Sequence, residues 1–468
     1  MGNGQVTMSN IFLSTAILTL AQIEINCQDE EVECGKVHGY KPSSLITLIG
    51  TVSGVLSALL LPFMGAIIDC TDHRRNVGIV SCFFLMLIQT IQIGTVESTW
   101  WIMAILQAIN GFIYQIVILA AFSYLPEIGR AVGEETLTAY SADWSILAYV
   151  AQIIYMMVVI GGSICFGLSD VQTGQLGQAV NVPASGICYY YACKFFSKKA
   201  ARRKLSIKES LFGTGCRQVF RTASSISRHY GPSLGWFLLA VTFSEAAANA
   251  FVLVAVTYLK EVMGFGSSEI GILFFIVIIA FIPGSYLGQW LTVVTSCPKT
   301  TMKLQLVTFI LVNFAGFFFF LTKPEQATLA YVFGALWGVL LGWFYPTEAL
   351  MFSLIVPQGQ ESELAGLFLY CSQILGWLPT LVFTLMNEKG IALKYGGAHL
   401  NIYLFVALMC YHFMLPWDQC LEAVQRNKML NESEVPIHAH TREGCESIEL
   451  SEIPSKPVGK VVFKRDLC

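Results

Sequence analysis

The sequence predicts an all-helical membrane protein with twelve spanning helices in two bundles of six. The 468-residue chain is 55% hydrophobic and only 13% charged, whereas soluble domains are about one-quarter charged. Its mean hydropathy is +0.61, and its apolar residues form runs near the ~20 residues that a spanning helix needs. This composition excludes an ordinary soluble enzyme and a disordered chain. The net charge of −3 provides no basic surface for nucleic acid.

Twelve windows are long and apolar enough to be spans. They are Val6–Ile25, Ser44–Ile68, Val77–Ile93, Trp100–Tyr124, Trp144–Leu168, Leu176–Phe196, Leu234–Leu259, Ile270–Val293, Leu304–Leu321, Ala327–Ile355, Leu364–Leu385 and Asn401–Trp417. The first window is the weakest, because it contains polar residues such as Asn10 and Glu24. No Lys or Arg precedes it, so it does not resemble a secretory signal peptide.

The basic residues predict the orientation. With a cytosolic N-terminus, the cytosolic segments contain 22 of the 28 Lys and Arg residues and the opposite side contains six. Basic residues are enriched in cytosolic loops. Both termini are therefore predicted to lie in the cytosol.

The chain divides into two halves and a linker. Residues 1–196 and 234–417 each contain six predicted spans, and residues 197–233 carry nine basic residues against one acidic residue. The linker is read as a positive-inside anchor, with an anionic-lipid site as the alternative. Residues 418–468 are polar and rich in Glu, which predicts a disordered cytosolic tail. Two parallel halves are typical of a class of secondary transporters.

One loop, between the second and third predicted spans, combines a glycine with charged residues. Gly65 would let helices approach closely. Asp69 ends a helix, where a carboxylate is unfavourable, so it should have a partner such as Arg74 or Arg75. The loop resembles the signature of the major facilitator superfamily, with Asp72 where that signature has Gly. The resemblance implies a conformational latch on the cytosolic face; charges that merely flank a span are the alternative.

A second loop is more specific. Pro357, Gly359, Glu361, Glu363 and Gly366 resemble the Pro-x-Gly-x-Glu-Ala-Glu loop of the vacuole effluxer family, an autophagy-linked branch of the same superfamily. The resemblance implies the major facilitator fold and export of amino acids, such as leucine, from the vacuole to the cytosol.

The two acidic residues of that loop have two readings. Glu361 and Glu363 could stabilise the N-terminus of the next helix, or they could pair with Arg74 or Arg75 as part of the latch. The chain departs from many family members in span ten, where Glu348-Ala349 replaces Ser-Arg.

Ionisable residues within spans are the main candidates for a substrate or proton site, because a carboxylate inside the bilayer is costly. Glu245 lies near the centre of span seven, with Asn249 one turn later. Glu348 lies in span ten beside Tyr345 and Pro346. Hydrogen bonding between helices is the alternative for these residues.

Span four carries one polar stripe. Gln107, Asn110 and Tyr114 are spaced so that they share a helix face. This stripe is interpreted either as a substrate contact or as a set of hydrogen bonds between helices.

Two further patterns in the second half concern packing. Gly334, Gly338 and Gly342 recur every four residues, which predicts a close helix contact. The run Phe317–Phe320 is predicted to face lipid.

The sequence contains no constellation typical of an enzyme. It has no phosphate-binding Gly-x-x-x-x-Gly-Lys-Ser/Thr motif, no Cys-x-x-Cys pair and no placeable Ser/His/Asp set. We therefore predict no enzymatic activity, no cofactor and no metal. Cys27 and Cys34 share one short non-cytosolic loop and are either a disulfide or two free thiols.

These observations favour a secondary active transporter that moves a small solute by alternating access, with proton coupling as an option and a monomer as the expected state. The alternative is a non-transporting receptor or scaffold that acts through its cytosolic tail. The resemblance implies a vacuolar or lysosomal membrane, with the plasma membrane as the alternative.

Overall fold

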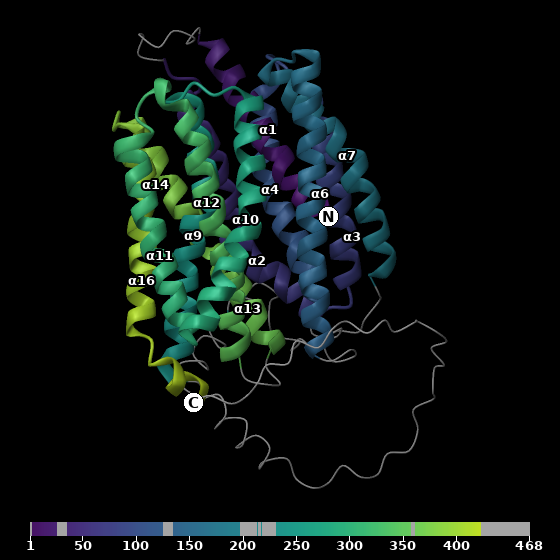
Figure 1. Ribbon diagram of the computed structural model, residues 1–468. Coiled ribbons are helices and arrows are strands. Elements are labelled where there is room, and N and C mark those ends of the chain that lie inside the picture. Colours follow the sequence, from purple (N-terminus) through teal and green to yellow (C-terminus); the bar gives the residue numbers. More distant parts are fainter. Residues whose placement is uncertain are drawn as a thin grey trace.

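The computed structural model describes residues 2–25, 35–124, 134–196, 231–356 and 361–422, together with residues 213 and 217. These segments form a sheaf of long helices (Figure 1). The first half of the chain contributes α1 (Gly2–Glu24), η1 (Pro42–Ser44), α2 (Leu45–Cys70), α3 (Arg74–Gln92), α4 (Trp100–Phe122), α6 (Glu134–Phe166) and α7 (Asp170–Phe195). The second half contributes α9 (Gly231–Glu261), α10 (Ser267–Thr295), α11 (Pro298–Ala315), η2 (Gly316–Phe320), η3 (Pro324–Gln326), α12 (Ala327–Ile355), α13 (Glu361–Ile374), α14 (Trp377–Glu388), α15 (Leu393–Ala398) and α16 (Leu400–Phe413).

The sheaf has two ends. We call the end where α1 finishes and α2 begins the upper end, and the end where α2 finishes and α3 begins the lower end (Figure 1). Trp100, which opens α4, donates its indole N–H to Glu24 at 2.6 Å and so marks the upper end. Arg74, which opens α3, bonds Ser123 at 2.9 Å and marks the lower end.

Ten segments within the described part of the chain are long and apolar enough to cross a membrane. They correspond to ten of the twelve predicted spans. The other two windows also form helices: α7 has 26 residues but is less apolar, and α16 has only 14 residues. The predicted span 364–385 is divided, because residues 375 and 376 form a turn between α13 and α14.

Each half of the chain packs mainly within itself. α1 lies along α7, and α2 and α3 lie along α4, whereas α10 lies along α12 and α9 along α16. The halves meet where α2 contacts α13 and α14, and where α6 contacts α10. The largest buried apolar cluster is centred on the second half, around side chains such as Trp337 and Phe309.

The glycine stripe of α12 is confirmed as a close helix contact. A Cβ atom on Gly338 would lie 2.4 Å from the carbonyl oxygen of Val277, and one on Gly342 would lie 2.1 Å from that of Phe281. Both carbonyls belong to α10. Only glycine lets the two backbones approach this closely, so the stripe holds α10 against α12.

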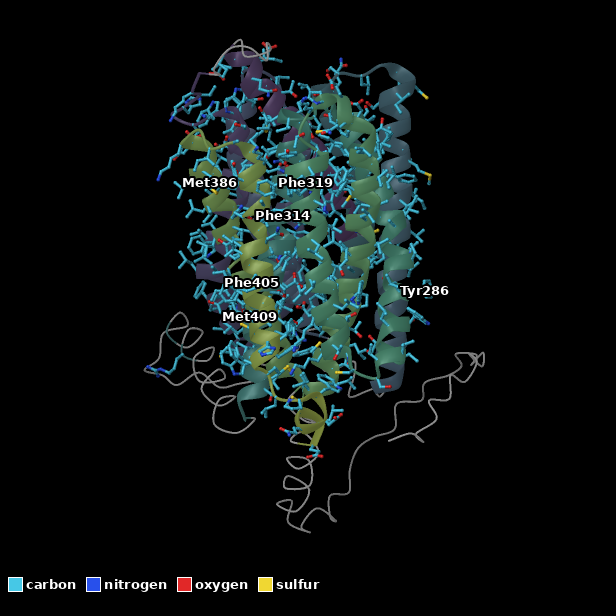
Figure 2. The ribbon with its side chains drawn as sticks, turned by 60° about the vertical axis from the view of Figure 1, so that its left-hand side comes forward. Tyr286, Phe314, Phe319, Met386, Phe405 and Met409 are labelled. Carbon is cyan, nitrogen blue, oxygen red and sulfur yellow. The ribbon has the colours of Figure 1, made fainter. Side chains whose placement is uncertain are left out.

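The outer surface of the sheaf is apolar. Tyr286, Phe319 and Phe405 are each more than half exposed, and Figure 2 shows them among the side chains on the outside. The prediction that the whole run 317–320 faces lipid is wrong for Phe317, which is fully buried. The π-helical turn η2 directs it inward, 4.9 Å from the ring of Tyr258.

Candidate functional site

Two buried carboxyl groups meet between α9 and α12. Glu245 is 8% exposed and Glu348 is 1% exposed. The two carboxyl groups interact electrostatically, and Ser244 donates its hydroxyl to Glu348 Oε1 at 3.1 Å. Two neighbouring carboxylates repel each other, and a buried setting screens this repulsion poorly, so such a pair favours a proton on one of its members. The pair is therefore a candidate site for holding a proton inside the sheaf.

Tyrosines from two helices face the carboxyl pair. Tyr345, one turn before Glu348 on α12, interacts electrostatically with both carboxyl groups. Tyr411 of α16 does the same, and its fully buried hydroxyl makes no hydrogen bond to a described residue. Sequence reasoning missed Tyr411. A tyrosine in an apolar helix of 14 residues has no sequence pattern that would mark it as part of a site. Only the packing of α16 on α9 brings Tyr411 near the pair.

Asn249 is separate from the pair. It lies one turn above Glu245 on α9, is exposed, and donates its amide to the carbonyl of Ser372 at 3.4 Å. The contact joins α9 to α13, so the structure brings together Glu245, Glu348 and Tyr345 from the predicted set and places Asn249 at the edge of this site.

A charged cluster joins the two halves of the chain at the upper end. Asp170, in the first turn of α7, pairs with Lys260 near the end of α9. Its carboxylate also accepts from the Ser267 amide at 2.7 Å and from the Thr19 hydroxyl at 3.1 Å. Four helices, α1, α7, α9 and α10, thus converge on one carboxylate. We call this the Asp170 cluster.

The electrostatics of the Asp170 cluster favour its ionised form. Burial by itself raises the pKa of Asp170, but Lys260 and the hydrogen bond from Ser267 outweigh it, so that the pKa lies below its usual value. Both members of the ion pair are mostly buried, with 13% and 20% of the Lys260 and Asp170 side chains exposed. The ion pair is therefore screened less than a surface pair would be.

A second polar contact also joins the halves at the upper end, where α14 meets α2. Glu388 accepts from the Lys41 amide at 2.7 Å and pairs with Lys36 at 3.0 Å. Asn387 donates to the hydroxyls of Ser43 and Ser44 at 2.7 and 2.8 Å. Deeper in the sheaf, two pairs of threonines continue the contact: Thr47 with Thr384 at 2.8 Å and Thr51 with Thr380 at 3.0 Å. We call this the Glu388 ladder, and the two contacts together the upper seal.

The polar stripe of α4 is occupied by α1. Gln107 donates to the Asn10 carbonyl and to Ser14, each at 3.2 Å. Asn110 donates to the Asn10 side chain at 3.2 Å. Tyr114 accepts from Thr7 at 3.2 Å. These bonds match the interhelical alternative for the stripe.

The latch residues are only partly brought together. Arg74 is buried at the start of α3, where it bonds Ser123 and stacks 3.8 Å over the Tyr124 ring, so it secures the end of α4. The expectation that Gly65 permits a close helix contact is wrong, since a Cβ atom there would meet no heavy atom within 4 Å. Asp69 is half-buried at the end of α2, and the Nε of Arg75 is buried without a hydrogen bond to a described residue.

Several predicted features lie outside the described residues. They are the side chains of Glu361 and Glu363, the cysteines Cys27 and Cys34, the linker apart from residues 213, 217 and 231–233, and the tail from residue 423. α13 does begin at Glu361, as a helix-opening role for these acidic residues requires.

Solved structures with the same arrangement of helices are transporters. A mutant form of the nucleoside transporter NupG has a TM-score of 0.57 at 12% identity, covering 89% of this chain and 99% of that one. The inward-open xylose transporter XylE from E. coli has a TM-score of 0.56 at 12% identity, with coverages of 90% and 98%. A D-xylose-proton symporter has a TM-score of 0.57 at 12% identity, with coverages of 89% and 96%. At such low identity these similarities show that the chain shares their fold, and no more.

Sequence comparison narrows this to one family. Autophagy-related protein 22 of Kluyveromyces lactis is 24% identical over 188 residues, which are 38% of this chain and 36% of that protein. The matched segment thus spans just over a third of the relative's length. The model of the family described as vacuole effluxer Atg22 like matches residues 5–421, and the chain therefore belongs to this family.

Proposed function

We propose that the protein is a proton-coupled secondary transporter with twelve spans in two six-helix bundles, residues 1–196 and 234–417. The distribution of Lys and Arg supports an orientation in which the lower end faces the cytosol and the upper end faces the lumen. A monomer suffices, because both bundles belong to one chain. The observation that carries the proposal is the buried carboxyl pair of Glu245 and Glu348.

The carboxyl pair supports a role in proton coupling for an energetic reason. Two unit charges 4 Å apart repel by about 4 kcal/mol at an effective dielectric constant of 20, so the pair holds a proton as long as it stays buried. Exposure to water or to the amine of a solute would let that proton leave. Each cycle of access to the two sides can therefore move one proton along with the solute.

The solute that fits this site best is small and neutral or zwitterionic. The groups facing the carboxyl pair are the hydroxyls of Ser244, Tyr345 and Tyr411, which can donate to a carboxylate or accept from an amine. Membership of the vacuole effluxer family favours amino acids as this solute, exported from the lumen to the cytosol.

The upper seal supports alternating access. For the lumen to reach the carboxyl pair, the Asp170 cluster and the Glu388 ladder must separate, because both tie the first half of the chain to the second. A solute drives such a change only if it binds the two states unequally. The structure thus represents a state whose upper end is closed.

Uptake into proteoliposomes tests the proposal. The protein is reconstituted in one orientation and uptake of a panel of radiolabelled amino acids is measured from pH 5 to 8, with and without an imposed pH gradient. We expect Glu348→Gln and Glu245→Gln to abolish the response to the gradient, because an amide keeps the shape and hydrogen bonding but does not titrate. Glu325→Gln, at an exposed residue of η3, is the matched control.

Two results would contradict the proposal. If no panel solute is transported by the unaltered protein although it is folded, the transport assignment fails for amino acids and the panel is widened to sugars and nucleosides. If both Gln variants respond to the gradient as the unaltered protein does, the carboxyl pair does not couple protons.

A further inference from the structure

An apolar groove lies on the outside of the sheaf at its upper end, between the first turns of α2 and α4. It encloses about 280 Å³, the volume of about nine water molecules at ~30 Å³ each. One wall is formed by Leu45, Leu48, Ile49 and Val52, and the other by Trp101, Ala104, Ile105 and Ile109. These walls belong to two candidate spans, so the groove opens toward the bilayer.

The groove is closed at one end by a tight turn. Val37 and Tyr40 exchange two backbone hydrogen bonds at 2.9 and 3.0 Å, and the residues between them, His38 and Gly39, both have positive φ (49° and 90°). Left-handed backbone is unusual for a residue other than glycine, and it concentrates at functional sites. The turn places the His38 ring 6.1 Å from the ring centres of both Trp100 and Trp101.

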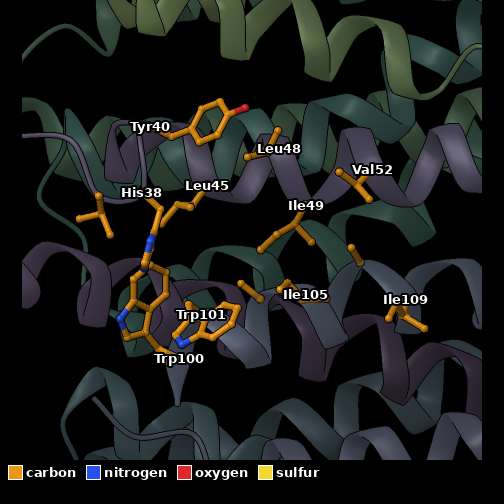
Figure 3. A pocket seen from close by; sticks show the side chains of 13 residues that line it. His38, Tyr40, Leu45, Leu48, Ile49, Val52, Trp100, Trp101, Ile105 and Ile109 are labelled. Atoms are coloured by element: carbon orange, nitrogen blue, oxygen red, sulfur yellow. The ribbon is translucent and has the colours of Figure 1, made fainter. Parts of the chain in front are cut away.

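The polar atoms of the groove gather at this end, whereas the deep end is purely aliphatic. Figure 3 shows His38, Trp100 and Trp101 at one end, and Val52 and Ile109 at the other. None of the thirteen lining residues is Asp, Glu, Lys or Arg. The indole N–H of Trp100 is already bonded to Glu24, which leaves the Tyr40 hydroxyl, the His38 ring and the Trp101 indole as hydrogen-bonding groups.

The length of the groove is close to that of a fused four-ring system. Its walls run from Leu45 to Val52 and from Trp101 to Ile109, which at 1.5 Å per residue is about 10–12 Å. Val52, Trp101 and Ile105 are 43–51% exposed, so bilayer molecules reach the groove directly. A phosphate head group would favour Lys or Arg side chains, and the lining contains neither. A single hydroxyl would be satisfied by the turn.

We infer that this groove binds a sterol from the upper leaflet. The fused rings lie between α2 and α4, and the hydroxyl meets Tyr40 and its neighbours at the membrane surface. The binding orders the turn at residues 37–40, which precedes the Lys41 and Ser43 contacts of the Glu388 ladder. The sterol therefore stabilises the closed upper end from outside the transport pathway.

Photolabelling tests the inference. The purified protein in phosphatidylcholine vesicles is irradiated with a diazirine sterol that retains its hydroxyl, and labelled peptides are mapped by mass spectrometry. We expect labelling within residues 37–52 and 100–109, and suppression by excess unlabelled sterol. The sterol methyl ether, which cannot donate a hydrogen bond, should compete about threefold to tenfold less well, as expected for loss of one hydrogen bond.

Two variants with a matched control sharpen the test. Val52→Trp fills the groove and should lower labelling at least about fivefold, on the scale of a lost apolar contact. Leu59→Trp, seven residues later on the same lipid-facing helix and outside the groove, should leave labelling unchanged. Tyr40→Phe keeps the ring but removes the hydroxyl and should weaken labelling as the methyl ether does.

Three results would overturn the inference. The first is label spread evenly over the lipid-facing helices and not suppressed by unlabelled sterol. The second is labelling of the groove by a diazirine diacylglycerol as strong as that by the sterol, and the third is equal labelling of Val52→Trp and Leu59→Trp. If Val52→Trp does not fold, competition by the methyl ether and the labelling of Tyr40→Phe still test whether the groove binds the sterol. Transport is measured separately, so a failure here leaves the proposed function intact.

Discussion

The two halves of the chain solve the problem of buried polar groups differently. In the first half, α1 and α4 meet through carboxamides such as Asn10, Gln107 and Asn110, which find hydrogen-bonding partners in one another. In the second half, α9 and α12 meet through two carboxyl groups, Glu245 and Glu348. A carboxamide does not titrate, so its bonds fix packing. A carboxyl pair changes its bonding with its protonation, so we place the proposed proton coupling in the second half.

The largest effect is expected where the carboxyl pair is removed. Glu348→Leu leaves Glu245 and Ser244 without their shared partner, and we expect uptake to fall at least about tenfold, because a coupled transporter without its proton site cannot complete the cycle. Uptake in proteoliposomes measures this. Unchanged uptake by folded Glu348→Leu would show that the carboxyl pair of the second half is not needed for transport.

The next effect concerns the contact between the halves. Asp170→Asn removes the ion pair with Lys260 and weakens the bond from the Ser267 amide. We expect unfolding to become easier by about 1.5–3 kcal/mol, the range for hydrogen bonds to charged groups, and the upper end to open more often. A cysteine replacing Thr51, in the deepest pair of the Glu388 ladder, should then react faster with a membrane-impermeant thiol reagent; an unchanged rate would argue against a sealing role.

The lowered pKa of Asp170 in the same cluster predicts how opening of the upper end depends on pH. The folded pKa of Asp170 is below its usual value, so its contribution to stability is fully present above the unfolded pKa of about 3.9 and is lost as the pH falls through the folded pKa. Because the thiolate is the reactive form, the labelling rate of the cysteine at position 51 is divided by that of a small free thiol measured at the same pH. Between about pH 5 and 7 this ratio should stay constant in the otherwise unaltered protein. A rise of the ratio over that interval would assign the opening to another titrating group.

A smaller effect is expected in the first half. Asn110→Leu removes the bond to Asn10 in a fully buried setting and should lower the free energy of unfolding by about 1–3 kcal/mol, while uptake stays within about twofold. Thermal unfolding and uptake are measured on the same preparation. A loss of uptake larger than the loss of folded protein would restore Asn110 to the substrate site.

The smallest effect is expected in the Glu388 ladder. Thr384→Val replaces one hydroxyl of a pair that is bonded at 2.8 Å, at a cost of about 0.5–1.5 kcal/mol. The remaining ladder should keep the upper end closed, so labelling at position 51 stays at the level of the unaltered protein. Opening as large as that of Asp170→Asn would place the main seal at the ladder rather than at the Asp170 cluster.

Part of the candidate site was predictable from the sequence because charge is rare in the spans. Glu245 and Glu348 are conspicuous as carboxylates in apolar windows, and burial confirms that they are inside. Their meeting was not predictable, since 103 residues separate them and periodicity reports only the face of a single helix. Asp170 carried no signal at all. An acidic residue at the start of a helix is ordinary, and only the approach of α9 gives it Lys260.

The sequence alone establishes the class of protein, the approximate position of ten spans and the presence of a close helix contact along the glycine stripe of α12. These follow from composition, from run length and from the spacing of Gly334, Gly338 and Gly342, all of which are local properties. The tertiary structure decides which polar groups become partners. It turns Phe317 inward, assigns the α4 stripe to α1, brings Tyr411 to the carboxyl pair and closes the upper end. The physical reason is that a hydrogen bond or ion pair depends on distances between helices, which no single segment contains.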